Sequence, residues 1–219
     1  MKKILLVLLH ALTMLSLLFL SIRVLGLETY FFQWFYSQNN TAANLGMSYA
    51  DLMRATEQLL KYMLDQASTI QSEVVVYGQT TLMFNQREID HMVDVLYLIR
   101  AMRIVMVIIL STSAIVYWTQ RTQQTFKDSL KQTYTIALGV LGGLMSAIGV
   151  FAWFDFESFW ILFHQMLFTN DLWLLDPRTD RLINMVPLNF FMTLVFSIIV
   201  TTVLLNGLYA YFIHRYSSK

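Results

Sequence analysis

Residues 133–154 read TYTIALGVLGGLMSAIGVFAWF and contain no Asp, Glu, Lys or Arg. A helix that crosses the hydrocarbon core of a bilayer needs about 20 mostly apolar residues, and this stretch meets that requirement. Three further apolar blocks occupy residues 4–27, 104–118 and 188–213. The block at 104–118 is short, and it reaches spanning length when Arg100 and Arg103 extend their charged ends towards the membrane surface. The pattern predicts an all-α membrane protein with four transmembrane helices.

The composition agrees with a surface that faces lipid. Hydrophobic residues make up 57% of the chain and charged residues only 13%, whereas soluble proteins contain about 25% charged residues. The chain has no cysteine, which excludes a disulfide framework, a thiolate nucleophile and a cysteine metal site. Its net charge of +1 gives no general attraction to nucleic acid, so we expect no nucleic-acid partner.

The distribution of basic residues predicts the orientation in the membrane. The start of the chain, the segment after Trp118 and the tail contain only one acid, Asp128, against these basic residues: Lys2, Lys3, Arg121, Lys127, Lys131, Arg215 and Lys219. Lys and Arg concentrate in cytoplasmic segments of membrane proteins. We therefore expect both termini in the cytoplasm and the two remaining polar segments outside it.

The expected organisation combines these spans with two extracytoplasmic segments. In chain order it comprises a transmembrane helix at 1–27, an extracytoplasmic domain at 28–99 leading into the second helix, a transmembrane helix at 100–119, a cytoplasmic loop at 120–132, a transmembrane helix at 133–154, an extracytoplasmic loop with an interfacial helix at 155–187 and a transmembrane helix at 188–213.

The outer domain is expected to be a small α+β structure. Residues 48–66 have helical periodicity, and Ser48 is a suitable N-cap. Residues 74–77 and 81–84 indicate two short strands around a turn at Gly78. Asn85, with Glu88 three residues later, predicts the cap of a long helix that continues to Trp118. The aromatic run at 156–168 is too short to span and predicts a short re-entrant or interfacial helix.

Two of the four histidines, His91 and His164, fall in these outer segments close to the expected membrane surface. Asp94 lies one helical turn after His91 and Glu88 one turn before it, so either carboxylate can reach the imidazole. A carboxylate partner fixes the tautomer of a histidine and raises its basicity, as a general base requires. His91, His164 and Asp94 are therefore candidate catalytic residues. The alternative is an ordinary surface ion pair at His91.

The sequence around these histidines resembles a known family. The segments EIDHMVDV (88–95) and FHQMLF (163–168), followed by Trp173, Asp176, Pro177 and Asp180, resemble the lipoprotein intramolecular transacylase (Lit) family of Gram-positive bacteria, and the resemblance extends over nearly the whole chain. It implies an acyltransferase that moves the sn-2 acyl chain of a diacylglyceryl-cysteine to the α-amine of that cysteine, giving a lyso-form lipoprotein. The functional histidines of the family fall on His91 and His164.

The resemblance also implies the setting of the reaction. The expected partners are a diacylated bacterial lipoprotein, as substrate, and membrane lipid. No cofactor and no metal are implied. The expected location is the bacterial cytoplasmic membrane, with the active site on its extracytoplasmic face. The oligomeric state is left open.

The chemistry of ester-to-amide transfer can be divided between two histidines. The reaction needs a neutral amine, stabilisation of an oxyanion and a proton for the leaving oxygen. Donor and acceptor belong to one molecule, so the enzyme mainly supplies orientation and needs no nucleophile of its own. Our hypothesis is that His91, oriented by Asp94 or Glu88, is the general base, and that His164 polarises the ester or protonates the leaving oxygen; the reverse assignment stays open. The alternative functions are an outer-leaflet lipid esterase, an intermolecular acyltransferase and a non-enzymatic membrane scaffold.

Overall fold

The computed structural model describes residues 3–217, so Lys2 and Lys219, which enter the charge pattern, lie outside the described residues. Within this range three helices are long and apolar enough to cross a membrane: α1 (Lys3–Gly26), α6 (Gln124–Phe154) and α9 (Leu188–Ser217). They contain three of the four predicted spans. The remaining span lies inside α5 (Gln86–Gln120), which is not one of these three helices. The number of four transmembrane helices therefore stays a prediction.

The chain forms two compact units. The first, which we call the helix-only unit, contains the chain up to Ile22, Met102–Phe159 and the chain from Ser197 onwards. The second, which we call the mixed unit, contains Arg23–Ala101 and Trp160–Phe196.

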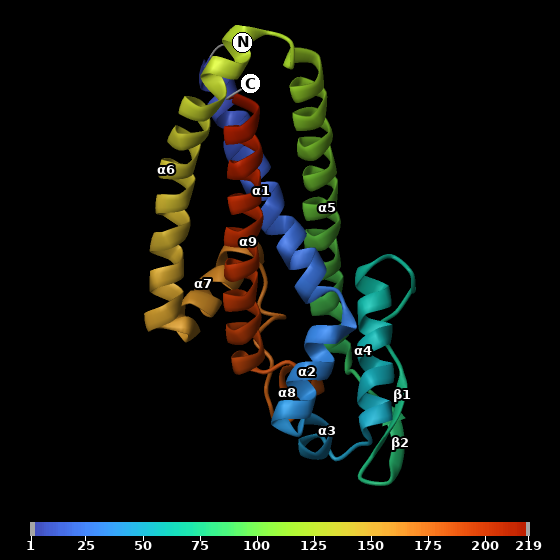
Figure 1. Cartoon of the computed structure of the whole chain (residues 1–219). Helices are drawn as coiled ribbons and strands as arrows, with labels where there is room; N and C mark the ends of the chain where they lie inside the picture. Colours follow the sequence, from blue (N-terminus) through green and yellow to red (C-terminus); the bar gives the residue numbers. More distant parts are fainter. Residues whose placement is uncertain (1–2, 218–219) are drawn as a thin grey trace. The chain divides into compact units, whose positions relative to one another are not determined.

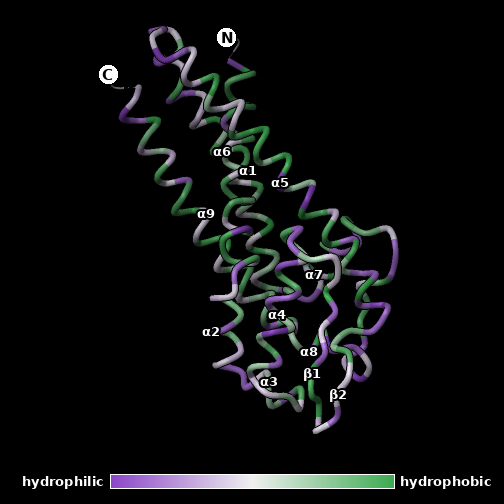
Figure 2. The backbone as a smooth tube through the Cα atoms, turned by 90° about the vertical axis from the view of Figure 1, so that its right-hand side faces the viewer, coloured by the Kyte–Doolittle hydropathy of each residue, from purple (hydrophilic) through white to green (hydrophobic). Residues whose placement is uncertain are grey.

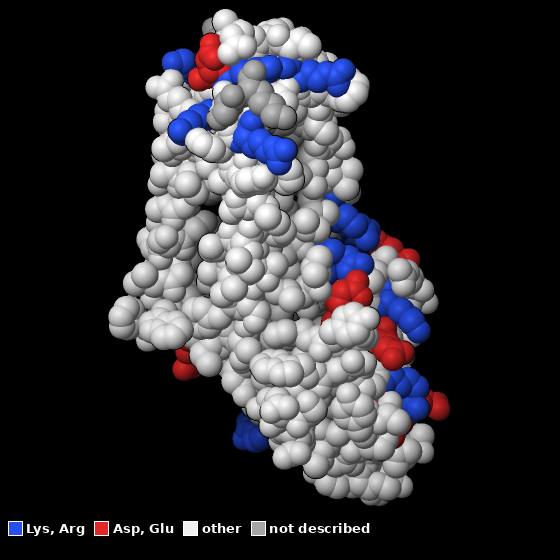
Figure 3. Space-filling view, viewed as in Figure 1, with Lys and Arg blue, Asp and Glu red and all other residues white. Residues whose placement is uncertain are grey.

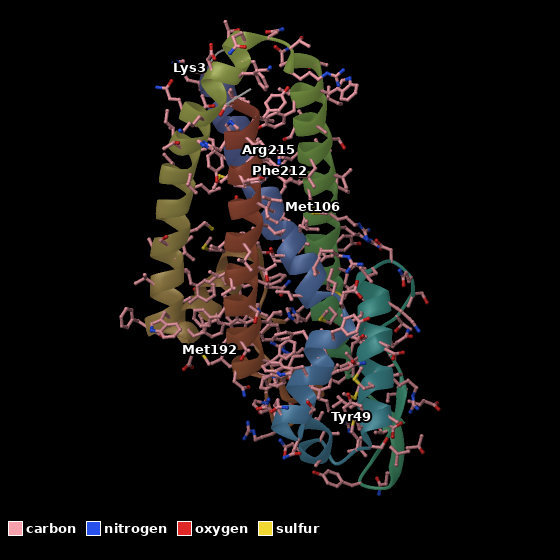
Figure 4. The ribbon with its side chains drawn as sticks, viewed as in Figure 1. Lys3, Tyr49, Met106, Met192, Phe212 and Arg215 are labelled. Carbon is pink, nitrogen blue, oxygen red and sulfur yellow. The ribbon has the colours of Figure 1, made fainter. Side chains whose placement is uncertain are left out.

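In the helix-only unit, three segments meet at one end. There α1 begins, α9 ends and α5 turns into α6 (Figure 1). The Nζ of Lys3 donates to Gln132 Oε1 at 2.7 Å, and the Tyr216 hydroxyl donates to the Arg121 carbonyl at 2.9 Å. Lys3 and Arg215 both lie at this end (Figure 4), where blue Lys and Arg atoms gather above a largely white surface (Figure 3).

Helix α6 begins earlier than its apolar sequence indicates. The segment 120–132, predicted to be a loop, is helical from Gln124 onwards, and this part of the prediction was wrong. Phe126 and Leu130 are buried in one core cluster with Leu6 and Ile213, whereas the polar residues Thr125, Asp128 and Lys131 of α6 are exposed. An amphipathic turn that buries two large apolar side chains continues a helix beyond its membrane-crossing part.

Polar side chains connect the helices of this unit within their apolar surroundings, which appear as the green tube along α1, α5 and α6 in Figure 2. The hydroxyls of Tyr209 and Tyr117 lie 2.7 Å and 3.1 Å from His10 Nδ1, and Thr13 and Ser113 share a hydrogen bond of 2.8 Å. Hydrogen bonds between side chains of neighbouring helices stabilise packing where lipid offers no alternative partner.

The first part of the mixed unit confirms the helix predicted within residues 48–66 and the hairpin predicted around Gly78. It comprises the elements α2 (Thr29–Asn39), α3 (Thr41–Asn44), α4 (Tyr49–Met63), β1 (Glu73–Val76) and β2 (Gln79–Leu82). The strands pair antiparallel, from Glu73 opposite Leu82 to Val76 opposite Gln79. Tyr77 and Gly78 between them have φ of 48° and 79°, the left-handed conformation of a tight hairpin turn. Helix α4, whose Ser48 cap accepts from the Asp51 amide at 3.0 Å, packs alongside this hairpin (Figure 1).

The second part of the mixed unit contains most of the short aromatic helix that the sequence predicted at 156–168. Helix α7 (Phe156–Leu167) enters it at Trp160 and is followed by a looped segment and by α8 (Arg181–Met185). The start of α9 supplies Phe190, whose ring lies 4.9 Å from that of Phe32 and 5.1 Å from that of Phe35. These α2 aromatics are buried and form part of the core of the unit.

Candidate active site

The first turn of α5 has the reciprocal cap that the sequence predicted. The Asn85 amide donates to Glu88 Oε2 at 2.7 Å, and the Glu88 amide donates to Asn85 Oδ1 at 3.1 Å. This pairing satisfies two amides that have no partner inside the helix. It fixes the position at which α5 begins, and thereby the direction in which the side chains of the next turns point.

The structure brings His91 of α5 and His164 of α7 together inside the mixed unit. Their ring centroids are 6.2 Å apart, with an angle of 35° between the ring planes. Both side chains are buried, with 8% and 7% of their surface exposed. Two imidazoles at this distance can act on neighbouring atoms of one substrate.

His164 is held by its own helix and by aromatic neighbours. Its Nδ1 lies 2.7 Å from the Trp160 carbonyl oxygen. A carbonyl oxygen only accepts hydrogen bonds, so Nδ1 carries the proton and Nε2 of the neutral ring has a free lone pair. The Trp160 ring meets the imidazole edge-on at 4.7 Å, and the Trp173 ring stacks on it at 4.9 Å.

Both histidines are held in the neutral form near pH 7. Burial lowers the pKa of His91 to about 4; the nearby His164 and Arg87 act in the same direction, and Asp94 opposes them. Burial also lowers the pKa of His164, against the opposing effect of its bond to the Trp160 carbonyl. In the described chain, Nδ1 of His91 is buried and has no hydrogen-bond partner.

The two carboxylates that flank His91 in sequence bond to other groups. Asp94 Oδ2 accepts from Asn170 Nδ2 at 2.8 Å. Glu88 accepts from the Asn85 amide and from the Leu182 amide. Within residues 3–217 neither carboxylate is hydrogen-bonded to His91, although helical spacing puts both within reach. The influence of Asp94 on the imidazole is therefore electrostatic.

Glu88 is part of a buried network that sequence spacing alone did not reveal. Its side chain is 1% exposed and accepts from the Leu182 amide at the start of α8. Asn85 Nδ2 donates to Asp180 Oδ1 at 2.7 Å, and Asp180 is itself 4% exposed. Burial raises the pKa of Glu88 more than its two amide donors lower it. For Asp180 the effect of burial is outweighed by donors from Asp176, Asn85 and Thr179, and its pKa is lowered.

A cavity of about 310 Å³ lies between α7 and the looped segment that follows it. Gln165, Asn170 and Trp173 are among the residues that line it. The lining combines polar groups, including the Asp171 carboxylate, with aromatic and aliphatic surface. Within residues 3–217 there is no group of three or more His, Asp or Glu side chains arranged to hold a metal ion.

The buried neutral state of His91 predicts a pH-dependent stability. Between its ordinary pKa of 6.5 and the folded value of about 4, the unfolded chain binds a proton that the folded chain does not. Stability contributed by His91 is therefore present at pH 7 and is lost as the pH falls through this window, by about 3 kcal/mol in all. We expect His91→Gln, which does not titrate, to flatten the pH dependence of the melting temperature between pH 6.5 and 4 in detergent. Equal slopes for both proteins would contradict a buried neutral His91.

Comparison with known proteins identifies the family to which this chain is similar. The family model described as Lipoprotein intramolecular transacylase Lit matches residues 7–191. The solved structure of the membrane-integral lipoprotein intramolecular transacylase Lit from Bacillus cereus has a TM-score of 0.72 and 22% sequence identity, covering 99% of this chain and 95% of that chain. Its variants with a histidine changed to alanine or to arginine each give a TM-score of 0.71 and 21% identity; both alignments cover 99% of this chain, and they cover 93% and 92% of those chains respectively.

A comparison with curated protein sequences found no match. At the identities given above, the solved structures support the fold alone. The family model extends over most of the chain and includes both histidines. The chain therefore belongs to the family of lipoprotein intramolecular transacylases, which are acyltransferases.

Proposed function

We propose that the protein moves the sn-2 acyl chain of a diacylglyceryl-cysteine to the α-amine of the same cysteine, giving a lyso-form lipoprotein. The amine nitrogen forms a bond to the ester carbonyl carbon, and the bond from that carbon to the glycerol oxygen breaks. The amine proton ends on the glycerol oxygen, so the step needs no oxidant, reductant or water. The observation that carries the proposal is the pair of neutral, buried imidazoles of His91 and His164, 6.2 Å apart in one compact unit.

The hydrogen bonding of the two rings supports a division of roles. His164 donates through Nδ1 to the Trp160 carbonyl, so its Nε2 is the unprotonated atom that can take the amine proton. In His91 the buried Nδ1 lacks a hydrogen-bond partner among residues 3–217, and an unpaired buried N–H is rarer than an unpaired acceptor. His91 therefore carries its proton on Nε2 and can donate to the carbonyl oxygen that becomes the oxyanion. This is the reverse of the assignment that sequence spacing favoured.

The proposed setting is the outer face of the bacterial cytoplasmic membrane. Four crossings, by α1, α5, α6 and α9, would leave both termini in the cytoplasm. This topology is supported by the meeting of the start of α1, the α5–α6 turn and the end of α9 at one end of the helix-only unit (Figure 1) and by the basic side chains gathered there (Figure 3). In this arrangement the site histidines act on the extracytoplasmic side, where the lipid-bearing cysteine of a diacylated lipoprotein is presented in membrane lipid.

The decisive experiment is mass spectrometry of the N-terminal peptide of a lipoprotein co-expressed with this protein in a host that leaves its lipoproteins diacylated. We expect an unchanged total acyl mass, with one acyl chain now attached to the cysteine amine. The same host without the protein is the control. Loss of one chain as free fatty acid would indicate an esterase, and an acylated second molecule an intermolecular transferase. An unchanged diacyl peptide beside well-expressed protein would contradict the proposal.

A further inference from the structure

One face of α5 lies against the segment that follows α7. Arg87, His91 and Asp94, spaced four and three residues apart, share this face of the helix. The Phe168 ring meets the His91 ring edge-on at 5.4 Å, and Arg87 donates to the Asp171 carbonyl. Asn170 donates to Asp94 at 2.8 Å. The path of the segment 168–171 is therefore set by contacts with three residues on one face of α5.

Asn170 uses both ends of its amide. Nδ2 donates to Asp94 Oδ2, and Oδ1 accepts from the Leu172 amide at 3.0 Å. The second bond closes a turn in which a side chain takes the place of a backbone carbonyl, as Asn commonly does. The Leu174 amide, which donates to the Asp171 carbonyl at 3.1 Å, continues this turn. Only a side chain with one donor and one acceptor can both fix this turn and bond to a carboxylate.

The turn delivers Trp173 to the face of His164. The indole and imidazole centroids are 4.9 Å apart, with 27° between the ring planes. When His164 takes a proton it becomes a cation, and the face of an indole ring attracts a cation in this position. The same stacking covers one face of the imidazole. Trp173 therefore stabilises the protonated, cationic form that His164 adopts when it acts as a base.

We propose that Asp94 and Asn170 are positioning residues: the hydrogen bond between their side chains, the 94–170 bridge, holds Trp173 against His164. The inference rests on the proposed function, in which His164 is the base. It assigns Asp94 a role different from orientation of His91. The essential property of Asp94 is then its acceptor oxygen facing Asn170, and its negative charge is not required at that position.

Exchanging the side chains of Asp94 and Asn170 separates the effect of the hydrogen bond from the effect of the negative charge at residue 94. Asn170→Asp places two carboxylates together and removes the donor, so we expect kcat for transacylation to fall on the order of tenfold or more. Asp94→Asn alone keeps an acceptor oxygen for Asn170 and should retain most of the activity. In the double variant the donor lies on residue 94 and both acceptors on residue 170, so the bridge re-forms. We expect its kcat to return to within about threefold of wild type, because coupled residues show strongly non-additive effects.

A second readout does not depend on turnover. Diethyl pyrocarbonate modifies unprotonated imidazole nitrogens, and mass spectrometry of the peptide gives the rate at His164. We expect Asn170→Asp to raise this rate several-fold, and the double variant to return it to the wild-type value. Asp90→Asn, on the same helix with its carboxylate bonded to Gln86, is the matched control and should leave both readouts unchanged.

The outcomes distinguish the inference from the function on which it rests. Rescue of both readouts by the double variant supports the bridge. Two results together would overturn the inference: the double variant has a kcat no higher than that of Asn170→Asp, and Asp94→Asn lowers kcat as much as Asp94→Ala does. They would show that the negative charge of Asp94 is required. If wild type does not transacylate, the proposed function fails, and the labelling rates alone decide whether the bridge holds Trp173 on His164.

Discussion

His164→Asn is expected to lower kcat for transacylation by a factor of 10² to 10⁴, the usual contribution of a positioned general base. The amide of asparagine can keep the donor to the Trp160 carbonyl but has no basic nitrogen where Nε2 of the imidazole lies. The fold around α7 is thus retained while the proton acceptor is lost. The measurement is the rate of acyl transfer on a synthetic diacylated lipopeptide, followed by mass spectrometry.

The variants of His91 test the division of roles. His91→Ala removes the proposed donor to the oxyanion, and we expect a loss of about 10²- to 10³-fold. His91→Gln restores an N–H at the end of the side chain and should recover part of that loss, whereas His164→Gln should recover none. The reverse pattern of recovery would assign the base to His91.

A histidine in the other compact unit provides the matched control for these variants. His214 is exposed near the end of α9, and His214→Ala is expected to keep full activity. Full activity of His91→Ala or His164→Ala would contradict the paired-histidine mechanism.

Glu88→Ala is expected to produce the largest loss of stability. The side chain is 1% exposed and accepts from the amides of Asn85 and Leu182. Its removal leaves the buried Leu182 amide without an acceptor, at a cost of about 1–3 kcal/mol. It also removes the acceptor of the Asn85 amide, which is only partly buried and costs less to leave unpaired. For a chain of this size a loss of about 3 kcal/mol corresponds to a fall in melting temperature on the order of 10 °C. Thermal unfolding of the detergent-solubilised protein measures this shift.

Two further variants make the Glu88 result specific. Glu88→Gln keeps one acceptor oxygen and places an amino group against the second N–H, so we expect an intermediate loss. Glu57→Ala changes an exposed glutamate on α4 of the same unit and should alter stability by less than about 0.5 kcal/mol. A melting temperature of Glu88→Ala equal to that of wild type would mean that the two amides have other acceptors.

The local elements of this protein could be predicted because their signals lie within a few residues. Ser48 before α4 and the Asn85–Glu88 pair before α5 are caps whose partners are three residues apart, and both are present. The hairpin around Gly78 follows from the left-handed conformation that its turn requires. The start of α6 was missed because Phe126 and Leu130 form a helical face only with a core to cover, and that core comes from α1 and α9.

The candidate site likewise contains features that the sequence predicted and features that it did not. The sequence indicated His91, His164 and Asp94 but gave Asp94 and Glu88 the wrong hydrogen-bond partner. Helical spacing indicates which side chains can come into contact. It does not indicate which of several possible hydrogen-bond partners a carboxylate takes. Asp94 bonds to Asn170, which is 76 positions away in the chain. A long-range partner of this kind leaves no periodic signal in a single sequence.

By itself the sequence determined the apolar segments, the helix caps, the hairpin and the family, because each depends on residues close together in the chain or on an ordered set of motifs. Only the tertiary structure decided that His91 and His164 meet, that Trp173 covers His164 and that Asp94 anchors Asn170. These contacts arise where α5, α7 and the segment after α7 pack together. Packing depends on the simultaneous fit of distant surfaces, which no local pattern in the chain records.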